Sequence, residues 1–160
     1  MDSKWQMFLN YQNGNTDYPS FDNALSEILI TKRKLSHWIW YILPIDKPSA
    51  TFKNLFIVNK NEVDKYLDIS SLRNNYILMI LCILQQLNNM DTCYYNDFIP
   101  FNDLKKTYNS VVMFSNTKKY VCVKKVCNDL VNLLKDYIYE HDKKHKHFQN
   151  MLLNCVRKAE

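Results

Sequence analysis

The chain has 160 residues, of which 47% are hydrophobic and 23% are charged, and it carries a formal net charge of +5. This composition predicts a single globular domain over residues 1–160 and excludes a disordered or collagen-like chain. Gly14 is the only glycine, which excludes the glycine-rich phosphate loops of the Walker and Rossmann types and disfavours all-β folds, whose tight turns draw on glycine.

Helical periodicity dominates the N-terminal half, where apolar residues recur at i, i+3, i+4 and i+7. Residues 77–84 are apolar nearly all round, which predicts a central helix enclosed by the others. The apolar runs 36–43 and 55–58 are compatible with either strand or helix. The predicted helices are one from Pro19 and Ser20 to residue 29, one over 62–67 capped by Asn59 or Asn61, and one from Ser70 or Ser71 to about Leu87.

The C-terminal half continues this pattern after an expected loop over residues 88–101. The most apolar run of the chain, residues 76–84, has 9 residues, about half of what a bilayer span requires. We predict a mainly α fold, a compact single-domain bundle of about six or seven helices. The predicted C-terminal helices run from Asn102 or Asp103 to Phe114, from Asn116 or Thr117 through Ile138, and over 141–157.

The most distinctive segment is residues 32–44, which combine three consecutive cations, a histidine and two of the three tryptophans. Cations neutralise phosphate, aromatic faces stack on planar rings, and histidine transfers protons near neutral pH. This combination suits an anionic ligand with a planar group, such as a nucleotide. The alternative interpretation is structural, because tryptophans mostly fill cores and a lone histidine is often a hydrogen-bonded core residue.

A second cluster, residues 141–147, contains His141, His145 and His147 among lysines. His141 and His145 share one face of a helix, which is the spacing of a metal-binding pair. Three lysines beside them oppose the binding of a cation, and no acidic residue that would orient a metal-bound histidine is evident. We therefore expect a solvated helix face here, and neither a metal nor another cofactor in the chain.

The string KRKLSHWIWYILP at residues 32–44 is the most specific part of a pattern that covers about residues 5 to 135. Its other elements are Phe8 and Gln12, ALSEI at 24–28, Ser49, EVDKYL at 62–67, Leu72 and Arg73, and Asp103, Lys106, Ser110 and Phe114. In order and spacing these elements resemble the domain-of-unknown-function family 1810 (DUF1810), small bacterial and fungal proteins sometimes labelled calpastatin-like. By analogy, the resemblance implies a link to NAD or ADP-ribose metabolism.

The chain also departs from the pattern of that family. Thr31 and Ile45 stand where the family has a glycine and a glutamine, and Tyr108, Asn109 and Val112 stand where it has an arginine, a serine and a threonine. These changes remove polar groups that would be available to a ligand. We expect a divergent member that keeps the fold while its activity is lost or redirected.

The first functional hypothesis is a domain that binds, and as an enzyme would process, a phosphorylated nucleotide-type ligand related to NAD or ADP-ribose. It rests on the premise that several matched polar residues are not needed to build a core. His37 and Glu27 are the catalytic candidates, for proton transfer. The ligand-binding candidates are Lys32, Arg33, Lys34 and Lys106 for phosphate, Trp38, Trp40 and Tyr41 for stacking, and Ser110.

The alternative hypothesis is a non-catalytic protein that sequesters a ligand or binds a protein partner, for example a viral factor that modulates its host. The lost motif residues motivate it, as does an excess of lysine, asparagine, isoleucine, tyrosine and phenylalanine, whose codons are AT-rich. A large DNA virus and an AT-rich cellular organism are both compatible with that bias. Nucleic acid is the least favoured partner, because 18 of the 21 basic residues are lysine and nucleic-acid readers favour arginine.

Five scattered cysteines without a CxxC pair indicate reduced thiols. The N-terminus has no apolar core of signal-peptide length. We therefore expect a soluble protein of a reducing compartment, cytoplasmic or nuclear, without a membrane partner. For a viral protein this compartment would be the host cytoplasm.

Overall fold

The computed structural model describes the backbone of residues 2–159 and the side chains of residues 2–151. Over this range the chain forms eight α-helices, one π-helical turn and one 3₁₀ turn, and no β-strand. The predicted mainly α class is confirmed, whereas the predicted number of six or seven helices is too low. The elements are α1 (Ser3–Gln12), α2 (Phe21–Ser26), the π turn η1 (Glu27–Thr31), α3 (Ile39–Ile42), α4 (Lys60–Asp68), α5 (Ser70–Asn88), the 3₁₀ turn η2 (Thr92–Tyr94), α6 (Tyr95–Phe98), α7 (Phe101–Phe114) and α8 (Val121–Ala159).

The sequence pattern predicts no helix over Ser3–Gln12, where α1 lies, and the other differences from the predicted elements lie in the short helices and in the last one. The run 36–43 contains the single turn α3, the expected loop 88–101 contains η2 and α6, and residues 55–58 have no regular structure. One-turn helices contain too few residues to show a periodic pattern. The two helices predicted from Asn116 or Thr117 through Ile138 and over 141–157 are one continuous helix, which begins later than predicted, at Val121, and which no proline or glycine interrupts.

Side-chain caps explain where α1, α2 and α4 begin, and at α1 the carboxylate of Asp2 accepts a hydrogen bond from the backbone amide of Lys4. Ser20 and Asn59 accept hydrogen bonds from backbone amides of α2 and α4, as predicted. The predicted caps of α5 and α7 are wrong: Ile69 and Pro100 precede these helices, and neither helix has a side-chain cap. Asp103 lies instead within the first turn of α7, where its carboxylate binds two lysines.

An aromatic cluster joins α4, α5 and α7 in the core. The ring of Tyr76 stacks on that of Phe114 with 4.1 Å between centroids, and Tyr66 meets both rings edge-on. α5 is not enclosed on all sides as predicted, since Leu78 and Leu81 on its outer face are each 43% exposed. Its opposite face packs against α8, α4 and α3, and its Tyr76 contacts Phe114 of α7.

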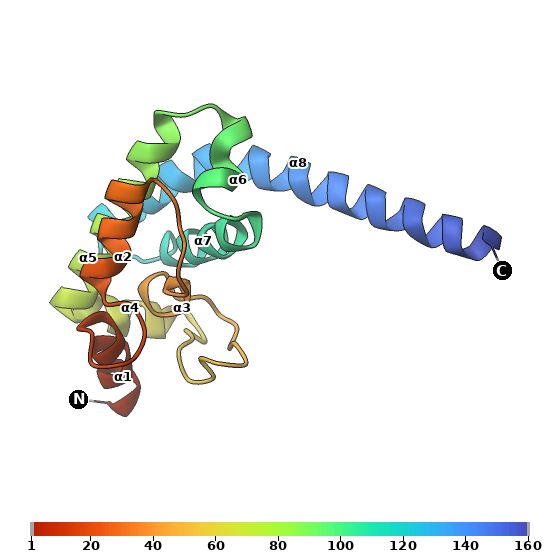
Figure 1. Cartoon of the computed structure of the whole chain (residues 1–160). Helices are drawn as coiled ribbons and strands as arrows, with labels where there is room; N and C mark the ends of the chain where they lie inside the picture. The colour runs from red at the N-terminus through yellow and green to blue at the C-terminus, as the bar shows by residue number, and fades with distance from the viewer. Residues whose placement is uncertain (1, 160) are drawn as a thin grey trace.

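α8 has 39 residues and consists of two parts with different surroundings. Its inner part buries Val123, Cys127, Leu130 and Leu134 against the bundle. Its outer part extends away from the rest of the molecule into solvent (Figure 1). Over the described residues no single helix is long and apolar enough to cross a membrane; α4 and α5 meet that requirement only when taken together, and they are bent by 103°.

The chain leaves α2 through η1, and the residue that follows η1, Lys32, has a backbone φ of 55°. Lys32 is the only non-glycine residue among those described with a positive φ. The hydroxyl of Thr31 secures the turn by donating to the carbonyl oxygen of Glu27 at 2.6 Å. A lysine in this left-handed region is strained, because its Cβ crowds the adjacent carbonyl oxygen.

Replacing Lys32 with glycine is therefore expected to raise the free energy of unfolding by about 0.5–1 kcal/mol, since glycine adopts this conformation without strain. Urea denaturation of the two proteins measures the difference. Arg33→Gly is the matched control: its φ is not positive, so the same substitution should lower stability by a similar amount. Equal effects of both substitutions would contradict the assigned strain.

Candidate functional site

The carboxylate of Glu27 holds the segment that leads into the tryptophan-rich region. Its Oε1 accepts hydrogen bonds from the backbone amides of Leu35 at 2.5 Å and Ser36 at 3.0 Å, and from the Trp38 indole nitrogen at 3.1 Å. Its Oε2 accepts one from the Ser36 hydroxyl at 2.5 Å. Both oxygens are thus occupied by donors from residues 35–38.

Burial alone would raise the pKa of Glu27, but the hydrogen bonds from Ser36, Leu35 and Trp38 outweigh it and hold the pKa below its ordinary value of 4.5. The carboxylate is therefore ionised at neutral pH and is not a ready proton donor. Because its oxygens already accept four hydrogen bonds, its role in this structure is to position residues 35–38.

A buried lysine lies beside this glutamate-bound segment. The side chain of Lys34 is 3% exposed, and its Nζ is 2.8 Å from Oδ2 of Asp103. The same Nζ donates to the carbonyl oxygen of Ser36 at 2.5 Å and lies 4.9 Å from the centroid of the Trp38 ring. Lys34 therefore connects the segment before α3 to the first turn of α7.

A second lysine shares the same aspartate from the more open side. Nζ of Lys106 is 2.8 Å from Oδ1 of Asp103 and 4.6 Å from the centroid of the Trp40 ring. Burial would raise the pKa of Asp103, but hydrogen bonds and charge from Lys106 and Lys34 hold it below its ordinary value. Two ammonium groups on one carboxylate leave a local excess of one positive charge.

We call the open part of this arrangement the motif face, defined by Lys106 and Trp40 above the Lys34–Asp103 pair. The side chain of Lys106 is 28% exposed and Trp40 is partly buried. His37, Lys32 and Arg33, on the neighbouring segment, are all exposed. Among the predicted ligand-binding and catalytic residues, these five have side chains that are accessible to a ligand.

Three other predicted site residues are buried. Trp38 is fully buried, and the hydroxyl of Tyr41 donates to the carbonyl oxygen of Pro19 at 2.7 Å. Burial raises the pKa of Tyr41 well above its ordinary value. The hydroxyl of Ser110 is 3.0 Å from that of Tyr76 in the core. None of the three presents a surface to a ligand in this structure.

The premise that the matched polar residues are not needed to build the core is therefore wrong for several of them. Gln12 is buried, and its amide nitrogen donates to the carbonyl oxygen of Tyr41 at 2.7 Å and to the hydroxyl of Tyr66 at 3.1 Å. Glu27 and Ser110 likewise satisfy internal polar groups. Several polar residues of the sequence pattern therefore stabilise the helical bundle through internal hydrogen bonds.

Asp103 is the residue that sequence reasoning did not place in the site. The available signal was its spacing from Lys106, since residues three apart face each other on a helix. Its contact with Lys34 spans 69 positions of the chain and has no counterpart in the local sequence. The sequence predicts separate lysines that each bind phosphate. In the structure, Lys34 and Lys106 both pair with the carboxylate of Asp103.

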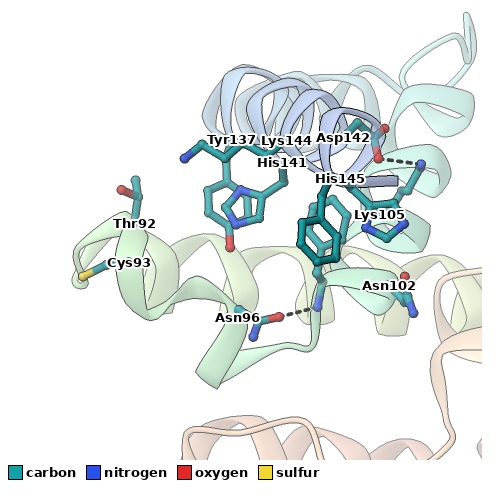
Figure 2. A pocket seen from close by; sticks show the side chains of 12 residues that line it. Thr92, Cys93, Asn96, Asn102, Lys105, Tyr137, His141, Asp142, Lys144 and His145 are labelled. Atoms are coloured by element: carbon teal, nitrogen blue, oxygen red, sulfur yellow. Dashed lines mark hydrogen bonds and ion pairs between the residues drawn. The ribbon is translucent and has the colours of Figure 1, made fainter. Parts of the chain in front are cut away.

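A separate hollow of about 730 Å³ lies between the start of α7 and the outer part of α8 (Figure 2). His141 and His145 point into it from α8, and Asp142 pairs with Lys105 at 2.9 Å. Across the residues that the structure describes, no three His, Cys, Asp or Glu side chains are grouped so as to hold a metal ion. No residue of the motif face lines this hollow.

Comparison with known proteins identifies a family. A family model described as "Protein of unknown function (DUF1810)" matches residues 3–147. The matched range includes the glutamate-bound segment, the motif face and every residue that lines the hollow except Phe148. No curated protein and no solved structure matches the chain.

Proposed function

The chain belongs to the DUF1810 family of proteins of unknown function, and we propose that it binds a phosphorylated ligand with a planar, nucleotide-type group at the motif face. The observation that carries the proposal is Lys106, a partly exposed ammonium group over a partly exposed indole ring. A cation beside an aromatic face provides the two contacts that such a ligand requires, one to phosphate and one to a ring.

The charge balance supports phosphate at this position. The single negative charge of Asp103 balances only one of the two lysines that contact it. Of these two, Lys34 is buried and Lys106 is partly exposed. The remaining charge lies on Lys106, which has solvent-accessible surface. A phosphate oxygen that accepts from Lys106 would form a charge-assisted hydrogen bond, the stronger kind in proteins.

The exposed residues of the preceding segment extend the proposed site. Lys32 and Arg33 are available to further phosphate oxygens, and Trp40 is the one partly exposed ring among the three predicted stacking residues. We assign any proton transfer to His37, because its ring is exposed whereas the carboxylate oxygens of Glu27 are occupied.

Calorimetric titration of the full chain with ADP, NAD and ADP-ribose tests this proposal, with adenosine as the uncharged comparison. We expect binding of at least one phosphorylated compound, weakened about tenfold or more in Lys106→Met, since a charge-assisted hydrogen bond contributes about 1.5–3 kcal/mol. Lys124→Met, an exposed lysine on α8, is the matched control. Folded protein that binds none of the three, or equal losses in both variants, would overturn the proposal.

A second candidate, a non-catalytic protein-binding module, is favoured by one different observation. Leu29, Ile30 and Leu35 are 39%, 78% and 68% exposed around the basic turn at Lys32 and Arg33. Apolar side chains beside cations are typical of surfaces that bind another protein. Turnover of a nucleotide by the wild-type chain, lost in His37→Ala, would exclude this candidate.

We further propose that the protein works in a reducing compartment. Cys82 and Cys127 are buried free thiols, and Cys93 and Cys122 are exposed free thiols. Buried thiols behave as small apolar residues and need no oxidising environment. The side chain of Cys155 lies outside the described residues.

A further inference from the structure

The hollow beside α8 is a surface that the proposed function does not use. One wall is formed by the chain from η2 to the start of α7, and the other by the outer part of α8. Figure 2 shows Tyr137, His141 and His145 of α8 facing the side of Asn96 and Asn102. α8 continues beyond the bundle into solvent (Figure 1), and the last residue of α8 that lines the hollow, Phe148, is exposed.

Aromatic rings make up the apolar part of the hollow. The ring of His141 stacks on that of Phe101 with 5.1 Å between centroids and lies 4.2 Å from that of Tyr137. Phe148, two turns further along α8, is 58% exposed. These rings form a platform on which one apolar side chain of a partner would be partly buried.

The polar part of the hollow is basic. Lys105 and Lys144 line it, and Lys143 and Lys146 lie on the same stretch of α8. The lining carboxylate, Asp142, is paired with Lys105. No ion pair joins another described residue to Lys143, Lys144 or Lys146. Glu140 lies four residues before Lys144 on the helix, but the two side chains are not paired.

We propose that this hollow is the docking site for an acidic segment of a partner protein, in which one aromatic or large aliphatic anchor is flanked by carboxylates. The anchor would lie on the ring platform, and the carboxylates would pair with Lys144 and its neighbours. Charge complementarity selects this occupant, because a second copy of a chain with a net charge of +5 would bring the same lysines. An extended peptide also fits an open-ended hollow better than a small molecule, which is normally enclosed.

Panning a display library of random peptides of about 12 residues against the full chain tests the proposal. We expect the enriched peptides to be net negative around one aromatic or large aliphatic residue. Fluorescence anisotropy with an enriched peptide should show affinity about tenfold weaker in Lys144→Glu and in Phe148→Ala than in the wild type. Both side chains are exposed, so neither substitution should change the thermal midpoint.

Lys124→Glu reverses an exposed charge on the inner part of the same helix and should leave the affinity within about twofold of the wild type, because charges far apart are screened. Failure to enrich peptides, enrichment of neutral or basic ones, or equal losses in Lys124→Glu and Lys144→Glu would overturn the proposal. So would single-stranded RNA that displaces the peptide and loses its own binding in Lys144→Glu, because that outcome assigns the surface to nucleic acid.

Discussion

Replacing Glu27 with alanine is expected to lower the free energy of unfolding by about 3 kcal/mol or more, because hydrogen bonds to a charged group contribute about 1.5–3 kcal/mol each and are not fully additive. The substitution removes the acceptor of four hydrogen bonds. The indole nitrogen of the fully buried Trp38 would then be left without its partner. Urea denaturation followed by tryptophan fluorescence measures the loss.

The pH dependence of this loss identifies the carboxylate as its source. The pKa of Glu27 is lowered in the folded chain, so its contribution is fully present above its ordinary pKa of 4.5 and disappears as the pH falls through the folded value. The difference between wild type and Glu27→Ala should therefore narrow below pH 4.5. Glu140→Ala, at an exposed position, is the control; a difference independent of pH would contradict the role assigned to Glu27.

Replacing Asp103 with alanine is expected to destabilise the fold by about 3–5 kcal/mol, the cost of leaving one partner of a buried ion pair uncompensated. Lys34, with a side chain that is 3% exposed, would retain its hydrogen bond to Ser36 but lose its counter-charge. Lys106 would lose the same partner but can turn toward solvent. Chemical denaturation at neutral pH measures the change.

A double variant distinguishes the cost of the uncompensated charge on Lys34 from the cost of the packing that is lost when Asp103 is truncated. Adding Lys34→Met to Asp103→Ala removes the uncompensated ammonium group, so we expect the double variant to recover about 1 kcal/mol or more relative to Asp103→Ala alone. Asp129→Ala breaks an exposed ion pair with Lys125 and should cost less than about 1 kcal/mol. A double variant less stable than Asp103→Ala would show that Lys34 contributes more by its packing than its charge costs.

Long amphipathic helices were the part of the fold that sequence could predict. The periodic pattern indicates α5 and, divided into two helices, most of α8, and Ser20 and Asn59 mark the starts of α2 and α4 by ordinary capping chemistry. The end of the π turn η1 has no comparable signal, because the strained residue that follows it, Lys32, is a lysine rather than a glycine. One-turn helices and irregular segments depend on tertiary contacts that local sequence does not contain.

The candidate site shows the same limit. Three consecutive cations are expected to have exposed side chains, and Lys32 and Arg33 are exposed. Lys34 is buried, because its ammonium group pairs with the carboxylate of Asp103. Lysine is almost never fully buried without such a partner. Glu27 was a candidate for catalysis until the structure showed its four donors. Polar residues that hold a fold together and polar residues that bind a ligand look alike in one sequence.

The length of α8 has a mechanical consequence. At about 1.5 Å per residue its 39 residues measure roughly 58 Å, whereas a compact chain of this size has a radius of gyration of about 15 Å. The far turns of α8 therefore lie well outside the bundle (Figure 1). A helix separates its two ends by its full length, whereas a flexible tail of equal length would let its two ends meet.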